Sequence, residues 1–161
     1  GIRIGIATAR SLALASKLPL IGINNFDCLI HNIPKHERQG RSVLAVLETK
    51  RADFYISLYD ENLSIVEGPK TLDSDGLRAL VKNKSILVLG DAADRGMEVL
   101  KGVSCNIIKS KLGSDVDLAV VATLAVDIIN SGLPIKLPLP LYLKPPNVNL
   151  LNLQPSIQRI K

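Results

Sequence analysis

The sequence predicts an α/β protein with a mixed β-sheet, and two observations support that class. Short runs of branched apolar residues, which are typical of buried strands, alternate with segments that carry helical periodicity and capping residues. Near the middle of the chain, two of these runs flank a short polar turn and predict a β-hairpin, so at least one strand pair is antiparallel. A length of 161 residues fits one domain or two small ones.

The N-terminal part contains two predicted helices with a strand between them. Residues 2–17 predict a helix that ends before a Leu-Pro pair, because the residue before a proline avoids helical geometry. Residues 20–24 are a short apolar run that predicts a buried strand. Asn25 is placed to cap a second helix, which ends near His31. Residues 34–41 are polar, and they form the predicted boundary between domains.

The rest of the chain continues the alternation of strands and helices. The predicted elements are hairpin strands at 43–47 and 54–59, a strand near 64–67, a helix capped by Asp73 or Ser74 and ending near 82, a strand at 86–89, a helix ending near 101, a strand at 106–108, and a helix that Ser114 caps and that closes at 130–132. Residues 133–161 hold most of the prolines and are predicted to be extended or irregular.

Charge and aromatic content argue against a direct nucleic-acid binder. The net charge of +5 permits a partner rich in phosphate, but the lysines and arginines are scattered along the chain. Only five residues are aromatic, which is too few for a platform on which unpaired bases stack. We therefore expect the excess charge to be a solvated surface.

Cysteine usage and hydropathy bear on the compartment. Cys28 and Cys105, the two cysteines, do not form a CxxC pair and are too few for a disulfide framework, so reduced thiols are expected. No apolar run reaches the length of about 18 residues that a membrane span needs, and no signal peptide pattern opens the chain. The sequence predicts a cytoplasmic protein with no membrane partner.

Small residues recur every four positions in the predicted helix 2–17. They form two rows, Gly1, Gly5, Ala9 and Ala13, and Ala7, Ser11 and Ala15. Rows at this spacing are the ridges that mesh when helices pack, and small side chains let two backbones approach closely. A glycine inside a helix costs about 1 kcal/mol relative to alanine, so Gly5 favours a close contact. Two alternatives stay open, packing against the protein's own sheet and a helix–helix contact with another chain.

The residues do not assemble into a catalytic or metal-binding pattern. His31 and His36, the only histidines, lack the spacing of a helical metal pair, and no nucleophile or phosphate-loop motif is present. The Gly90-Asp91 junction between a strand and a helix is a weak candidate for phosphate binding through backbone N–H groups, although such a junction is more often only a capped turn. Carboxylates near the hairpin, among them Glu48 and Asp53, are expected to be solvated. No catalytic residue, cofactor or metal is expected.

Three segments resemble a known family. Residues 1–15, GIRIGIATARSLALA, followed by LPLIGI at 18–23, resemble the GLRIGLATAKGLA…IPLVGV stretch of the TsaB family, also called YeaZ. Residues 43–55, VLAVLETKRADFY, are similar to the family's VLALLDARRGEVY hairpin, and residues 140–145, PLYLKP, are similar to its PxYLRxP motif. Members of this glycoprotease-like family take part in bacterial tRNA threonylcarbamoyladenosine biosynthesis.

The sequence departs from the family pattern in several places. The family's opening LAIDTS strand and its GPGSFT run have no counterpart, so the chain is expected to be an N-terminally truncated member with most of the first domain missing. Glu48 replaces the usual Asp, Ala52 replaces the second residue of the turn, and Lys144 replaces the usual Arg. Lysine keeps the positive charge at that position but loses the two-pronged geometry of a guanidinium.

The resemblance implies an actin- and sugar-kinase-like (ASKHA) fold, with a mixed sheet flanked by helices. Residues 1–38 would be the end of a first domain, residues 39–146 a second α/β domain, and residues 147–161 an irregular or flexible tail. It implies a non-catalytic subunit that supports a TsaD-type transferase, which modifies the adenosine beside the anticodon, together with a TsaE-type ATPase. The expected partner interface, for the transferase or for a second copy of the chain, is the set Gly1, Gly5, Ala9, Ser11 and Ala13.

Two other classes of function stay open. The first is an enzyme, either a glycoprotease-like hydrolase or an ASKHA-type kinase, whose catalytic residues would lie in the missing N-terminal part. The second is a direct tRNA-binding module, which only the net charge of +5 favours. Under the subunit interpretation, tRNA is contacted only indirectly.

Overall fold

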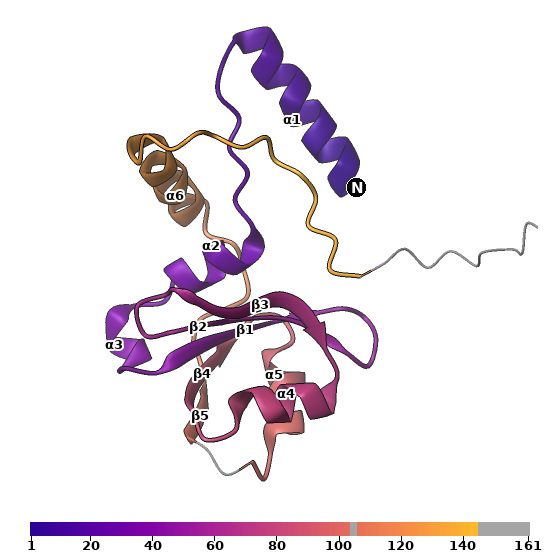
Figure 1. Ribbon diagram of the computed structural model, residues 1–161, viewed down its shortest axis with the longest axis vertical. Coiled ribbons are helices and arrows are strands. Elements are labelled where there is room, and N and C mark those ends of the chain that lie inside the picture. The colour runs from indigo at the N-terminus through magenta and orange to yellow at the C-terminus, as the bar shows by residue number, and fades with distance from the viewer. Residues whose placement is uncertain (104–105, 145–161) are drawn as a thin grey trace, which may run out of the picture.

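The structure is a computed structural model that describes residues 1–103 and 106–144, and its centre is a five-stranded sheet of order β3-β2-β1-β4-β5 (Figure 1). The first three strands are antiparallel, whereas the last two run parallel to β1, so the predicted mixed sheet is confirmed. The strands are β1 (Ser42–Glu48), β2 (Phe54–Tyr59), β3 (Ile65–Leu72), β4 (Ser85–Leu89) and β5 (Asn106–Lys109).

Alternation along β1 supplies both faces of the sheet with core residues. Leu44 and Val46 point to one face, which the helices α4 (Ser74–Val81) and α5 (Ala93–Leu100) cover. On the opposite face, Val43 and Ala45 pack with side chains of the helix α2 (Asn25–His31). The chain therefore has helices on both sides of one sheet, as expected for the predicted class.

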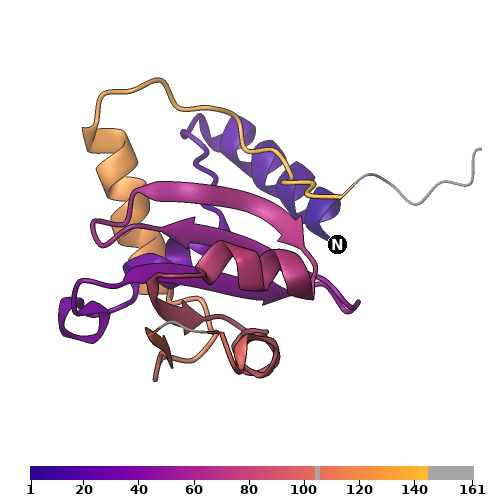
Figure 2. The ribbon, with the colours of Figure 1, turned by 60° about the horizontal axis from the view of Figure 1, so that its bottom comes forward.

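Three segments lie outside these layers. The helix α1 (Ile2–Ser16) and the helix α6 (Leu118–Asn130) stand beyond the α2 face of the sheet, and α6 packs beside α2 (Figures 1 and 2). Residues 133–144, which we call the strap, lead from α6 along α1 and have no regular secondary structure. In the described part of the chain, no helix is long and apolar enough to cross a membrane.

The strand predicted at residues 20–24 is wrong. These residues are extended but join no sheet, and each is exposed or half-buried. Gly22 packs against Pro138 of the strap, so closely that an added Cβ would overlap the proline ring. An apolar run beside a proline-rich segment has no row of N–H groups to pair with, because proline lacks that donor. The run was therefore correctly identified as apolar but wrongly predicted to be a buried strand.

Two predicted caps and one predicted connection also need correction. The side chain of Asn24, one residue before the predicted cap, accepts a hydrogen bond from the N–H of Asp27 at 2.9 Å and begins α2. At α6 the cap is Asp117, which accepts from the N–H of Ala119 at 2.8 Å, and not Ser114. Within the polar connection, α3 (Lys35–Arg38) forms a single helical turn. Several polar residues in a row can each act as a cap, so composition did not select among them.

Candidate functional site

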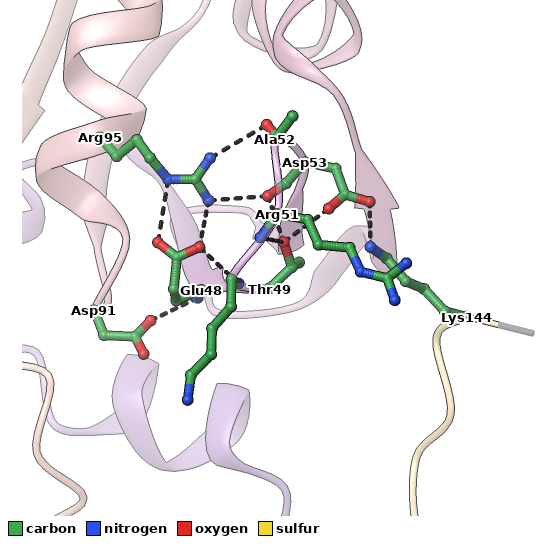
Figure 3. Close-up of polar contacts among 9 residues, drawn as sticks. Glu48, Thr49, Arg51, Ala52, Asp53, Asp91, Arg95 and Lys144 are labelled. Atoms are coloured by element: carbon green, nitrogen blue, oxygen red, sulfur yellow. Dashed lines mark hydrogen bonds and ion pairs between the residues drawn. The ribbon is translucent and has the colours of Figure 1, made fainter. Parts of the chain in front are cut away.

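A polar cluster lies where β1 and β4 end, and it is the part of the sheet where an α/β fold places ligands. Parallel strands end at the same edge, and loops that follow neighbouring strands meet there. In this chain the turn at residues 49–53 follows β1, and Gly90-Asp91 follows β4. Figure 3 shows that side chains from both loops, from α5 and from the strap converge on this turn.

Arg95 of α5 is the centre of the cluster. Its guanidinium donates to both carboxylate oxygens of Glu48, at 3.1 Å from Nε and 2.7 Å from Nη2 (Figure 3). It also donates to the backbone carbonyls of Ala52 and Asp53, and it stacks 3.8 Å from the ring centroid of Phe54. Partial burial alone would raise the pKa of Glu48, but the hydrogen bonds from Arg95 and from the backbone hold it below its ordinary value.

Asp53 joins this turn to the strap. Its carboxylate forms an ion pair with the ammonium of Lys144 and accepts from the Thr49 hydroxyl at 2.7 Å. These two contacts, the one with Lys144 first, lower the pKa of Asp53. Asp53 is therefore held as a carboxylate between two segments that are 91 residues apart in the sequence.

Three backbone N–H groups at the end of β1 and in the turn donate to side-chain oxygens of the chain. The N–H of Glu48 donates to Oδ1 of Asp91 at 2.8 Å, and the N–H of Lys50 donates to Oε1 of Glu48 at 3.0 Å. The N–H of Arg51 donates to Oγ1 of Thr49 at 3.1 Å. Because these three N–H groups are bonded to protein oxygens, they are not free to bind the oxygens of a phosphate.

The structure gives each residue of the weak phosphate candidate a packing or capping role. Gly90 has a φ of +114°, and a Cβ there would overlap the carbonyl oxygen of Val46. Only glycine can approach the β1 backbone this closely, which explains its position after β4. The Asp91 carboxylate turns back onto Glu48 of β1, while the N–H groups of Ala92 and Ala93 donate to backbone carbonyls.

The second candidate site is the face of α1. None of the fifteen residues of this helix is buried, and Ile4, Leu12 and Leu14 are 73%, 64% and 82% exposed. A methyl group added at Gly1 or Gly5 would meet no atom within 4 Å, whereas Ala9 and Ala13 are half-buried. The ridge of small residues is thus open at its N-terminal half and does not pack against the sheet of this chain there. Ser11 donates only within its own helix, to Ala7 at 3.0 Å.

Sequence reasoning found part of these sites. It singled out the α1 ridge, Gly90, Asp91 and the hairpin carboxylates, but it treated Glu48 and Asp53 as solvated, whereas their side chains are only about a third exposed. Arg95 was missed, because its partner lies 47 residues away and no local pattern marks such a pair. His31 contacts the carbonyl of Asp27, and no group of three His, Cys, Asp or Glu side chains among the described residues suits a metal ion.

Comparisons with known proteins place these features in a family. Residues 1–131 match the family model described as TsaD, tRNA N6-adenosine threonylcarbamoyltransferase. The fold is similar to the crystal structure of an uncharacterized protein with similarity to peptidase YeaZ from Pseudomonas aeruginosa, with a TM-score of 0.61 and 19% identity. That match covers 89% of this chain and 68% of the other. Together with the helix-flanked mixed sheet, it confirms the expected actin- and sugar-kinase-like fold class. No curated protein matches the sequence.

Replacing Arg95 tests whether the polar cluster holds the hairpin turn. We expect Arg95→Ala to lower the free energy of unfolding by about 1–2 kcal/mol, because several charge-assisted hydrogen bonds and the contact with Phe54 are lost at a partly exposed site. Urea denaturation followed by circular dichroism measures the change. Lys101→Ala removes a mostly exposed ion pair with Glu98 and is the matched control, with an expected change below about 0.5 kcal/mol. Equal effects of the two variants would contradict the assignment.

Proposed function

The chain belongs to the family of TsaD, the tRNA N6-adenosine threonylcarbamoyltransferase, and of its YeaZ-like relatives, and we propose that it serves this tRNA modification as a non-catalytic subunit. In this proposal it supports a TsaD-type transferase, with a TsaE-type ATPase as a further member of the complex. Residues 1–38 then belong to a first actin-like domain and residues 39–146 to a second, while the tail at 147–161 lies outside the described residues. The cytoplasm is the proposed compartment.

The observation that carries the proposal is the unburied helix α1. This helix of fifteen residues exposes isoleucines and leucines to water. A partner that covers them gains about 25 cal/mol of binding free energy for each Å² of apolar surface that is removed from water. Its row of small residues is suited to close approach by a second helix, and Gly5 has open space beside it. We assign this face, with Gly1, Gly5, Ala9, Ser11 and Ala13, to the contact with the transferase subunit or with a second copy of the chain.

The polar cluster supports the non-catalytic part of the proposal. A kinase or ATPase of this fold class needs free donors for phosphate at the strand ends and carboxylates free to hold a metal. Here Glu48 is bound to Arg95 and Asp53 to Lys144, and the N–H groups of Glu48, Lys50 and Arg51 donate to oxygens of the chain. Phosphate would have to displace bonded carboxylates, which carry the same sign of charge as the incoming ligand.

A hydrolase is the second candidate function, because the structural neighbour is named for its similarity to a peptidase. The described residues offer this reading little support. Among the described residues, neither His31 nor His36 makes a hydrogen bond with Cys28 or with a hydroxyl side chain, and His31 is engaged by the backbone of its own helix. The subunit proposal therefore explains more of the observed contacts.

Substitution at Gly5 tests the interface on α1. We expect Gly5→Leu to weaken association with the TsaD-type subunit by at least about tenfold, because the larger side chain holds the two helices apart. The fold of the chain should survive, since nothing lies within 4 Å of the position and replacing a helical glycine adds stability. Ala9→Leu and Ala13→Leu are expected to act in the same direction. Calorimetric titration of the two purified subunits gives the dissociation constant.

The matched control for Gly5→Leu is Ala79→Leu. Ala79 is an exposed position on α4, on the far face of the sheet, so the variant adds the same side chain to a helix that the proposal leaves free. Its dissociation constant should equal that of the unmodified chain. Unchanged affinity of Gly5→Leu and Ala9→Leu would remove α1 from the interface.

Nucleotide binding is a separate test. We expect no micromolar, magnesium-dependent binding of ATP and no hydrolysis by the chain alone, because the Asp91 carboxylate accepts from the N–H of Glu48, and the N–H groups of Lys50 and Arg51 donate to side chains of the chain. Calorimetric titration with Mg-ATP is the measurement. Micromolar binding that Asp91→Ala abolishes would overturn the non-catalytic assignment and restore Gly90-Asp91 as a phosphate site.

For tRNA, we expect only weak and non-specific binding by the chain alone. Basic side chains are scattered along the sequence, and Arg95, Lys109 and Lys144 are engaged by carboxylates, whereas a chain that holds tRNA alone normally groups its cations on one face. Filter binding at physiological salt measures the affinity. A sub-micromolar dissociation constant that distinguishes the cognate tRNA from others would show that this chain reads RNA itself.

A further inference from the structure

The strap, residues 133–144, has no regular secondary structure and is held by contacts at Pro138, Tyr142 and Lys144. It contains Pro134, Pro138 and Pro140, which have no N–H to donate, and it forms neither helix nor strand. Leu133, Leu137, Leu139 and Leu141 are more than half exposed, whereas Leu143 packs against the core cluster on the α2 face of the sheet. Its position must therefore come from the specific polar and packing contacts that it makes.

One set of contacts joins the strap to α1. The guanidinium of Arg3 donates to the hydroxyl of Tyr142 at 2.5 Å and lies 5.2 Å from the ring centroid. About two turns further along α1, Arg10 donates to the carbonyl of Pro138 at 2.5 Å. Gly22, in the segment that connects α1 to α2, packs directly on the same proline. These contacts fix α1 along its length and at its exit, and they all lead to the strap.

Lys144 of the strap contacts the sheet and its hairpin turn. Lys144 forms the ion pair with Asp53 in the hairpin turn, and its ammonium also lies 5.8 Å from the ring centroid of Tyr55 on β2. With side chains 20% and 27% exposed, this is the least exposed ion pair among the described residues. Asp53 is itself oriented by Thr49 and by the donation from Arg95 to its carbonyl. The strap is thus fastened to the hairpin turn and to β2 of the sheet.

We propose that the Lys144–Asp53 ion pair is a latch that positions α1 through the strap, and thereby presets the partner face of that helix. The inference rests on the proposed function only for its consequence, the binding of a partner through α1. Because α1 has no buried residue, its orientation depends on the strap contacts and on the connecting segment. When the latch opens, α1 samples other orientations. The apparent affinity for the partner is then the intrinsic affinity multiplied by the fraction of molecules whose α1 is correctly oriented.

The first experiment measures α1 itself, without a partner. ¹⁵N relaxation of the full chain gives order parameters for the amides of α1 and of the sheet. In Lys144→Ala we expect the α1 values to fall from about 0.85 toward about 0.6, while those of β1 and β4 stay unchanged. Lys144→Arg keeps the charge and should restore the values. Lys101→Ala, which removes an exposed ion pair on α5, should alter neither.

The second experiment measures partner binding in a double-mutant cycle. Asp53→Asn and Lys144→Ala are each expected to raise the dissociation constant for the TsaD-type subunit about tenfold, and the double variant should be no worse than either one. Tyr142→Phe, which removes the acceptor for Arg3, should also raise it. Neither strap variant changes a residue of the proposed α1 interface.

The outcomes separate the two proposals. Unchanged order parameters in α1 of Lys144→Ala, or additive effects of Asp53→Asn and Lys144→Ala, would overturn the latch. Loosened α1 with an unchanged dissociation constant would support the latch and reject α1 as the partner face. Loosened α1, weakened binding and rescue by arginine would support both.

Discussion

The guanidinium of Arg95 is the contact on which the arrangement of the polar loops depends. It joins α5 to the hairpin turn by pairing with Glu48 and by holding the carbonyls of Ala52 and Asp53. Once the turn is fixed, the Asp53 carboxylate is held where it forms the ion pair with Lys144 of the strap. The order of dependence runs from the sheet through one planar cation to a segment with no secondary structure. A lysine could not make the same contacts, because its ammonium has three donors on one nitrogen, whereas Arg95 makes four hydrogen bonds from three nitrogens.

The distribution of apolar surface divides the molecule into two parts. Both faces of the sheet are covered by helices, and their core side chains are almost completely removed from water. By contrast, neither α1 nor α6 has a buried residue, and Leu118, Val126 and Ile129 of α6 are more than half exposed. Soluble chains rarely leave such surface uncovered without a use for it. The sheet therefore buries its own core, whereas the two outer helices leave apolar side chains exposed.

Sequence reasoning recovered the elements with strong local patterns. The hairpin, the strand at β4 and the helix α4 were predicted because alternation, capping and turn residues agree there. Failures arose where the deciding contact is distant. Residues 20–24 have the composition of a strand but lie against Pro138, and Arg95 is an unremarkable helical residue until the fold brings Glu48 beside it. The family resemblance identified Lys144 as a special position, but only the structure supplied Asp53 as its partner.

The two edges of the sheet restrict how another protein can join this one. At one edge, β3 contains Pro69, which lacks an N–H, and its pairing with β2 is interrupted by register shifts. At the other edge, β5 has only four residues, Asn106–Lys109. Neither edge presents a long unbroken ladder on which a foreign strand can be added, so β-augmentation is disfavoured on both sides. A partner protein would then have to bind through side-chain surfaces. Side-chain contacts distinguish one partner from another, whereas a free backbone edge can pair with almost any extended peptide.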